Sequence, residues 1–133
     1  MSQLVLDEHL GRTEVLAPLQ KWLTATKIED LAGDEILKDD RILQLLCQRK
    51  QPTFVTLDDD FFHRRLCDRR YCLMYCVVPR QQQHRIPVIL RRVFRLPEFA
   101  TKAARMGKVV RVHEQDIDFW QVGLGKRQHL RLG

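Results

Sequence analysis

Residues 53–60 read Thr-Phe-Val-Thr-Leu-Asp-Asp-Asp, an apolar run that ends in three consecutive carboxylates. The run follows Pro52 and is typical of a short buried strand. The same order of strand and acid occurs earlier in the chain, where Leu4-Val5-Leu6 is followed directly by Asp7 and Glu8. Two strands that each end in an acid predict that carboxylates gather at one edge of a sheet.

Segments with helical spacing alternate with further apolar runs along the rest of the chain. In addition to the two strands already named, strands are expected over residues 27–31, 71–78, 109–112 and 117–122. Helices are expected over 15–23, where Pro18 should shorten or kink the helix, over 39–49, over 86–94 and over 97–107, with a short helical segment over 60–70. Strands that alternate with helices predict an α/β fold with three layers and a mostly parallel sheet.

The length and composition indicate one compact domain. The chain has 133 residues, of which 44% are apolar and 30% are charged. We expect this domain to occupy residues 1–122. Residues 123–133 are rich in Gly and basic side chains and are expected to form a C-terminal tail without regular structure.

Charge is distributed unevenly along the chain. Residues 1–60 hold 12 acids and 7 bases, whereas residues 61–133 hold 5 acids and 16 bases. A basic half of this kind indicates a polyanionic partner such as a nucleic acid, while the carboxylates are concentrated in the first half.

The sequence also bears on the cellular compartment. The longest apolar run, Tyr71–Val78, has eight residues. A membrane-spanning helix needs about 20, so no such span is expected. The start at Met1-Ser2-Gln3 does not have the pattern of a secretory leader. Four cysteines are then expected to be reduced thiols in a cytoplasmic protein rather than disulfides.

The acids that follow the strands suggest a metal site. Asp7 and Asp58 should meet at the carboxyl edge of the sheet, where ligands bind in α/β folds. Asp60 lies two residues beyond Asp58, about 7 Å along an extended chain. A fourth acid, Asp39 or Asp40, begins a helix and joins the others if the preceding loop reaches this edge. Clustered carboxylates repel one another unless a cation neutralises them, and oxygen ligands favour Mg²⁺ or Mn²⁺ over zinc.

Two simpler interpretations of these acids remain open. Asp39 or Asp40 can serve only as the cap of the following helix. The acidic triplet over residues 58–60 can be a solvated turn without a ligand. With a cation, in contrast, the cluster can activate water and stabilise the attacking and leaving oxygens of a phosphodiester.

Two groups of arginines are candidates for phosphate binding. The first, Arg64 and Arg65, is separated from Asp60 by three residues, and the second comprises Arg91 and Arg92. The chain contains 16 Arg and 7 Lys, and guanidinium groups bind phosphate in a bidentate manner. The alternative is that these side chains form ordinary solvated faces.

A zinc or redox site is a further alternative for residues 63–76. The candidate ligands are His63, Cys67, Cys72 and Cys76, but they lack the paired Cys-x-x-Cys spacing of zinc knuckles. Cys72, Met74 and Cys76 alternate along a strand, which favours one buried face of soft side chains.

Three acidic motifs occur in the order found in one known family. They are Asp7-Glu8-His9-Leu10, Asp39-Asp40-Arg41-Ile42-Leu43 and Thr56-Leu57-Asp58-Asp59-Asp60-Phe61. With these motifs the chain resembles the PIN-like ribonucleases of toxin–antitoxin modules over nearly its whole length. Further stretches that resemble the family are Arg64-Arg65-Leu66-Cys67, Tyr71-Cys72-Leu73 and the segment 105–112.

The resemblance implies a Rossmann-like sheet and a Mg²⁺- or Mn²⁺-dependent endoribonuclease. Its acidic quartet would be Asp7, Asp39, Asp58 and Asp60, and water on the metal would attack phosphorus to leave a 5′-phosphate and a 3′-hydroxyl. The partners it implies are RNA and a small antitoxin, which can also bring copies of the toxin together as a homo-oligomer. His9 stands where the family usually has Asn, and Leu57 where Arg is common. These two departures favour the alternative of an inactive PIN-like module that binds RNA or protein.

Overall fold

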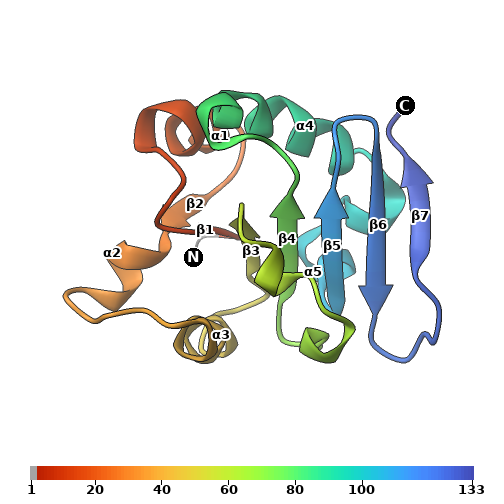
Figure 1. Cartoon of the computed structure of the whole chain (residues 1–133), viewed down its shortest axis with the longest axis horizontal. Helices are drawn as coiled ribbons and strands as arrows, with labels where there is room; N and C mark the ends of the chain where they lie inside the picture. The colour runs from red at the N-terminus through yellow and green to blue at the C-terminus, as the bar shows by residue number, and fades with distance from the viewer. Residues whose placement is uncertain (1–2) are drawn as a thin grey trace.

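The structure, a computed structural model, describes residues 3–133 and contains a seven-stranded sheet with helices on both faces (Figure 1). Met1 and Ser2, which entered the expectation about a leader, lie outside the described residues. The strands are β1 (Leu4–Leu6), β2 (Ala25–Lys27), β3 (Thr53–Thr56), β4 (Cys72–Cys76), β5 (Lys108–Val112), β6 (Asp116–Gln121) and β7 (Gln128–Arg131). The α-helices are α1 (Ala17–Gln20), α2 (Ile28–Ala32), α3 (Asp39–Cys47), α4 (Ile86–Val93) and α5 (Lys102–Arg105). Short π or 3₁₀ segments are η1 (Arg12–Leu16), η2 (Asp59–Phe61), η3 (Arg64–Leu66), η4 (Arg80–Arg85) and η5 (Pro97–Phe99).

The sheet is mostly parallel, as the alternation of strands and helices predicts. The strand order is β2-β1-β3-β4-β5-β6-β7, and the first five strands in this order pair in parallel. β6 and β7 extend the sheet by antiparallel pairing. The α/β class is therefore confirmed, with an antiparallel hairpin added at one edge.

Two hydrophobic clusters lie on opposite faces of the sheet, because successive side chains of a strand point to opposite sides. Leu4 and Leu6 face the first cluster, together with apolar side chains of α4, whereas Val5 faces the second cluster, together with those of α3. In the part of the chain that the structure describes, no helix could cross a membrane, since the longest, α3, has nine residues.

The cysteines of β4 lie in the first cluster, as their alternation predicts. Cys72 and Cys76 are 0% and 2% exposed, and Met74 lies between them. Burial raises the pKa of both thiols to about 12, so they are protonated at neutral pH. Cys67 packs against the second cluster, on the other side of the sheet. The four candidate zinc ligands are therefore divided between the two faces and do not form one site.

The prediction of a strand over residues 27–31 is wrong. The strand β2 ends at Lys27, and Ile28–Ala32 forms α2. Ile28 and Leu31 are three residues apart, a spacing that fits a helical face as well as a short apolar strand. The expected helix over 60–70 is two separate 3₁₀ turns, η2 and η3.

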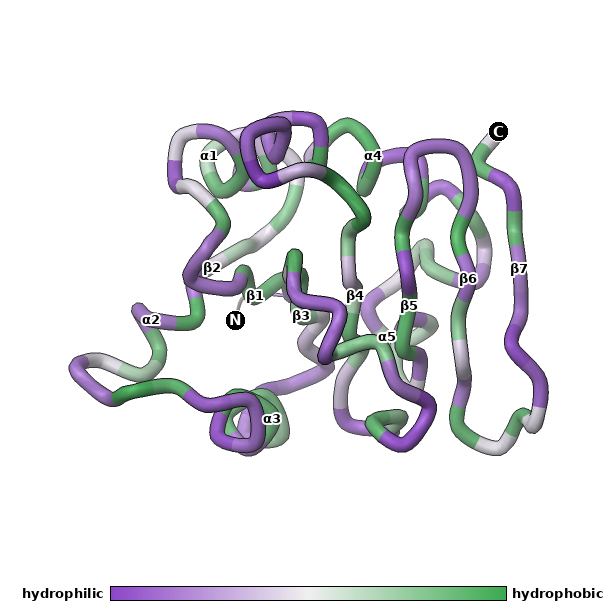
Figure 2. The backbone as a smooth tube through the Cα atoms, in the orientation of Figure 1, coloured by the Kyte–Doolittle hydropathy of each residue, from purple (hydrophilic) through white to green (hydrophobic). Residues whose placement is uncertain are grey.

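Residues 123–133 do not form an irregular tail. Gly123 has a φ of +83°, which only Gly adopts without strain, and the chain turns back there toward β6. β7 then pairs with β6, and Leu132 is buried in the first cluster. The sequence of β7 is mostly hydrophilic (Figure 2), because one face of this strand points to solvent. It was therefore not recognised as a strand from its hydropathy.

Candidate acidic active site

The strand order reverses direction at β1. From β1 the chain crosses to β2 on one side and then returns to β3 on the other side of β1. In open α/β sheets a ligand crevice forms at such a reversal, beyond the carboxyl ends of the strands. Asp7 follows β1 and Asp58 follows β3 closely. The topology thus directs both acids to the place where this fold offers a site.

Three carboxylates meet at this edge. Asp39, Asp58 and Asp60 each offer an oxygen atom that lies within 4.8 Å of the other two. Asp39 is the first residue of α3, and the other two belong to the turn after β3. Asp39, and not Asp40, is therefore the helix acid that joins the cluster. The N-cap position is occupied by Lys38, so neither aspartate is the helix cap.

The turn after β3 is held by one hydrogen bond and one aromatic contact. Asp60 donates its backbone N–H to Oδ1 of Asp58 at 2.9 Å, which closes η2. Phe61 is 2% exposed and packs edge-on against Phe54 of β3, with ring centroids 5.1 Å apart. The sequence Asp-x-Asp-Phe therefore places two acids at the surface by burying the residue that follows them.

Thr56 connects the two strand acids. Its hydroxyl donates to Oδ2 of Asp7 at 2.6 Å and accepts the backbone N–H of Asp58 at 3.0 Å. Both Thr56 and Asp7 are buried. Asp7 is not one of the three carboxylates within 4.8 Å of one another, and Thr56 links it to Asp58 instead. Sequence reasoning quoted Thr56 only as part of a motif and missed this role.

A buried lysine holds the loop that follows Asp7. Lys27, at the end of β2, is 1% exposed and donates to the backbone carbonyls of Asp7 at 2.9 Å, Glu8 at 3.0 Å and Leu10. Burial lowers the pKa of this ammonium group, although Glu29 lies nearby. The sequence predicted that Lys27 begins a strand and did not indicate that its side chain is buried.

The acidic cluster is electrostatically strained in the absence of a cation. Asp39 is exposed, yet partial loss of its hydration and the nearby charges of Asp58, Asp60, Asp7 and Asp40 together raise its pKa. The donor set consists entirely of carboxylate oxygens, which suits a hard divalent cation such as Mg²⁺ or Mn²⁺. The residues present therefore fit such an ion, with Asp39, Asp58 and Asp60 as the side chains that would hold it.

The raised pKa of Asp39 predicts how metal-free stability depends on pH. The folded protein holds this proton more tightly than the unfolded chain, so the free energy of unfolding falls as pH rises from the unfolded pKa of 3.8 through the higher folded pKa. At pH 7 the metal-free Asp39→Asn variant should be more stable than the wild type, and this difference should disappear toward pH 3. Thermal unfolding in chelator across this pH range measures it. Asp40→Asn is the matched control, and an equal gain in that variant would contradict the assignment.

Two hollows lie on either side of the acids. The first, of about 440 Å³, is lined by Asp59, Asp60, Phe62, His63, Tyr75, Val77, Arg111 and His113. The second, of about 340 Å³, is lined by His9, Leu57, Asp58, Val78 and Arg80. Arg80 therefore places a positive charge in the second hollow, whereas Leu57 in the same hollow is uncharged. Arg80, Arg111 and His113 were not identified as site residues from the sequence. All three lie near the carboxyl ends of β4 and β5, and residues at the carboxyl ends of parallel strands are expected to line a ligand site.

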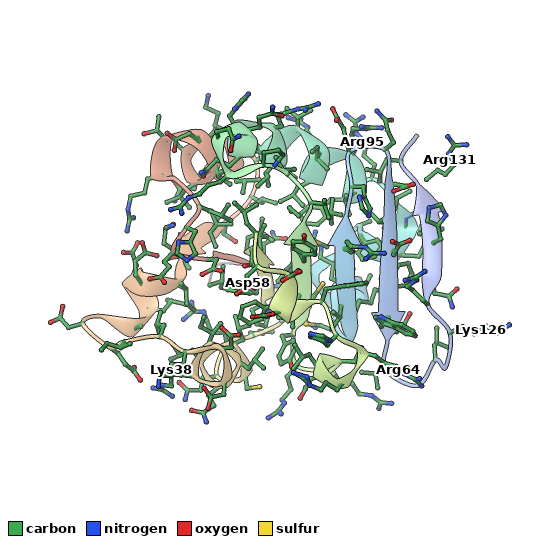
Figure 3. All side chains as sticks on the ribbon, in the orientation of Figure 1. Lys38, Asp58, Arg64, Arg95, Lys126 and Arg131 are labelled. Atoms are coloured by element: carbon green, nitrogen blue, oxygen red, sulfur yellow. The ribbon has the colours of Figure 1, made fainter. Side chains whose placement is uncertain are left out.

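The predicted phosphate-binding arginines fall on two different faces. Arg64 and Arg65 are exposed on η3, in the same segment after β3 that carries Asp58 (Figure 3). Arg91 and Arg92 belong to α4, which covers the opposite face of the sheet from α3. Arg92 donates to the backbone carbonyls of Glu114 at 2.8 Å and Leu132 at 3.2 Å. The first pair therefore follows the acids in the chain, with Arg64 lying against Trp120 of β6, and the second pair lies on the opposite face of the sheet.

Comparison with known proteins gives no match: no family model, no curated protein and no solved structure matches this chain.

Proposed function

We propose that the protein is a Mg²⁺- or Mn²⁺-dependent endoribonuclease with a Rossmann-like, PIN-like domain. The observation that carries this proposal is the meeting of Asp39, Asp58 and Asp60 within 4.8 Å at the switch point of a mostly parallel sheet. The resemblance of the three acidic motifs to the PIN-like family supports it and names RNA as the substrate.

Each acidic residue has a separate part in this proposal. A bound cation would polarise a phosphodiester and activate water for in-line attack. Asp39, Asp58 and Asp60 provide the ligands, whereas Asp7 adds a fourth negative charge and is oriented by Thr56. The hollows on both sides leave room for the nucleotides that flank the reacting phosphate.

Cations near the acids suit a negatively charged substrate. Arg80 lines one hollow and Arg111 the other, so a phosphate that approaches the acids meets a positive group from either side. The positions of Arg80 and Arg111 support an active enzyme, while His9 and Leu57 support the alternative of an inactive module that binds RNA or protein.

The test is cleavage of RNA by the purified protein with and without metal. We expect structured or unstructured RNA to be cut in Mn²⁺ or Mg²⁺, to be protected by chelator and to be cut again when excess Mn²⁺ is restored. Products should carry a 5′-phosphate and a 3′-hydroxyl. Metal-independent cleavage would contradict the proposal, and binding without cleavage would support the inactive module.

The cellular setting is part of the same proposal. We propose a cytoplasmic toxin whose partner is a small antitoxin protein, on the strength of the family resemblance and of four free thiols. Growth arrest on expression, relieved in an Asp58→Asn variant, is the expected result. Equal growth inhibition by both proteins would argue against a toxin that acts through cleavage.

A further inference from the structure

The β5–β7 part of the sheet has one face that no α-helix of residues 3–133 covers. Val110 and Val112 of β5 and Ile117 and Phe119 of β6 point into the first cluster. The alternate residues therefore point to the other side, where Figure 1 shows no α-helix of residues 3–133 in front of these strands and only the segment with η2 and η3 beside β5. They are Arg111 on β5, Asp116, Asp118 and Trp120 on β6, and His129 and Arg131 on β7, and we call this surface the open face.

Two arginines lie against aromatic rings at the open face, Arg64 from η3 and Arg111 from β5. The guanidinium carbon of Arg64 is 5.5 Å from the ring centroid of Trp120, and that of Arg111 is 4.7 Å from the centroid of Phe62. Nη2 of Arg111 also donates to Oδ2 of Asp118 at 2.7 Å. These contacts fix two guanidinium groups in position before any ligand arrives.

The residues of the open face hold two arginines and two aspartates, and the excess of positive charge comes from Arg64, Lys126 and Arg127 at its border. Burial opposes the ionisation of Asp118, yet its pKa is lowered because Arg111 donates to it and because Arg127 and His129 are near. Three basic groups thus surround one carboxylate. Lys126 and Arg131 add charge along β7 and the loop before it (Figure 3).

The open face is continuous with the acidic site. Arg111 lines the same hollow as Asp60. Arg64, beyond it, lines a further hollow of about 480 Å³ together with Gly123 and Gly125. From β4 to β7 the surface crosses three strand spacings, or ~14 Å. A chain that leaves the acids can therefore follow basic groups across the sheet.

We propose that the open face binds the single-stranded RNA segment that leaves the acidic site, with Arg111, Arg64 and Arg127 as its phosphate contacts and Trp120 as the aromatic support of Arg64. This proposal rests on the proposed function for the identity of the polyanion. Unpaired bases stack on guanidinium planes and aromatic rings, whereas paired bases inside a duplex do not offer their faces. The open face therefore fits a single strand better than a duplex.

The structure offers a matched control on the opposite side of the molecule. Arg91 on α4 lies over the ring of Trp22 at 5.5 Å, the same distance as Arg64 over Trp120. Arg95 is exposed nearby, at the end of α4. If charge alone governed binding, loss of Arg91 and Arg95 would weaken RNA binding as much as loss of Arg64 and Arg127.

The experiment measures binding of a labelled single-stranded RNA in chelator, where cleavage does not interfere, over a series of salt concentrations. Arg64→Gln with Arg127→Gln should weaken binding and reduce the salt slope by ~1.4, since each phosphate contact to a single strand contributes about 0.7. Arg91→Gln with Arg95→Gln should leave the RNA affinity and its salt slope unchanged. Trp120→Leu should weaken binding of the single strand ~10-fold and leave binding of duplex RNA unaffected.

The outcomes separate this inference from the proposed function. Equal effects of the two double variants, no effect of either, or no RNA binding by the wild type would overturn the inference. All four arginines are exposed, so these variants keep the fold, which their thermal unfolding checks. RNA binding through the open face without metal-dependent cleavage would refute the proposed function alone. If the wild type cleaved RNA and the Arg64 and Arg127 variant bound RNA as tightly as the wild type, only the proposal that the open face binds RNA would be refuted.

Discussion

Replacing Asp58 by Asn is expected to remove the stabilisation that Mn²⁺ gives the wild-type protein. A ligand that binds only the folded state adds about 2.7 kcal/mol to the free energy of unfolding at 100 times its dissociation constant. Asn keeps an oxygen for the backbone N–H of Asp60 but removes one of the three charges that would hold the ion. Thermal unfolding with and without Mn²⁺ measures the difference. RNA cleavage should fall at least ~100-fold, because metal stabilisation of the transition state amounts to several kcal/mol.

Without metal, the Asp58→Asn substitution should increase the stability of the protein. One repelling charge leaves the cluster in Asp58→Asn, so the variant in chelator should unfold at a slightly higher temperature than the wild type. Asp59→Asn is the matched control, since Asp59 is adjacent in sequence but is not one of the three clustered acids. An Asp58→Asn protein with a normal response to Mn²⁺, or an Asp59→Asn protein that lost it, would refute the metal site.

The second large effect is expected from Thr56→Val. Valine fills nearly the same volume but leaves Oδ2 of buried Asp7 without its hydroxyl donor and the N–H of Asp58 without its acceptor. A hydrogen bond to a charged group contributes about 1.5–3 kcal/mol, so the free energy of unfolding should fall by roughly that amount. Affinity for Mn²⁺ should also fall, by about 10- to 100-fold, as when a group that orients metal ligands is removed.

Thr56→Ser separates the hydroxyl from the methyl group. It keeps the donor and acceptor, so its Mn²⁺ affinity should stay near that of the wild type even where the lost methyl group lowers stability. Chemical denaturation and metal titration of the three proteins provide the measurement. If the Val variant bound Mn²⁺ as tightly as the Ser variant, the bridge between Asp7 and Asp58 would have no part in the site.

The sequence predicted the strands and helices whose apolar residues recur at a regular spacing within a short segment. The apolar runs of β1 and β3, each closely followed by acids, and the nearly continuous apolar strand β4 predicted a parallel sheet with acids at its edge. The helix that begins at Asp39 was also predicted, because its apolar residues recur at helical spacing. β2 and β7 were missed because short strands carry little periodic signal and β7 has one solvated face.

The tertiary structure alone decided which acids meet and what supports them. A helix that follows a parallel strand runs back along the sheet, so α3 begins at the carboxyl edge and brings Asp39, rather than Asp40, to Asp58 and Asp60. Thr56 and Lys27 act through contacts between different strands, which no local pattern encodes. The order of acids along the chain thus indicates that a site exists, whereas its geometry depends on the strand order that places distant residues side by side.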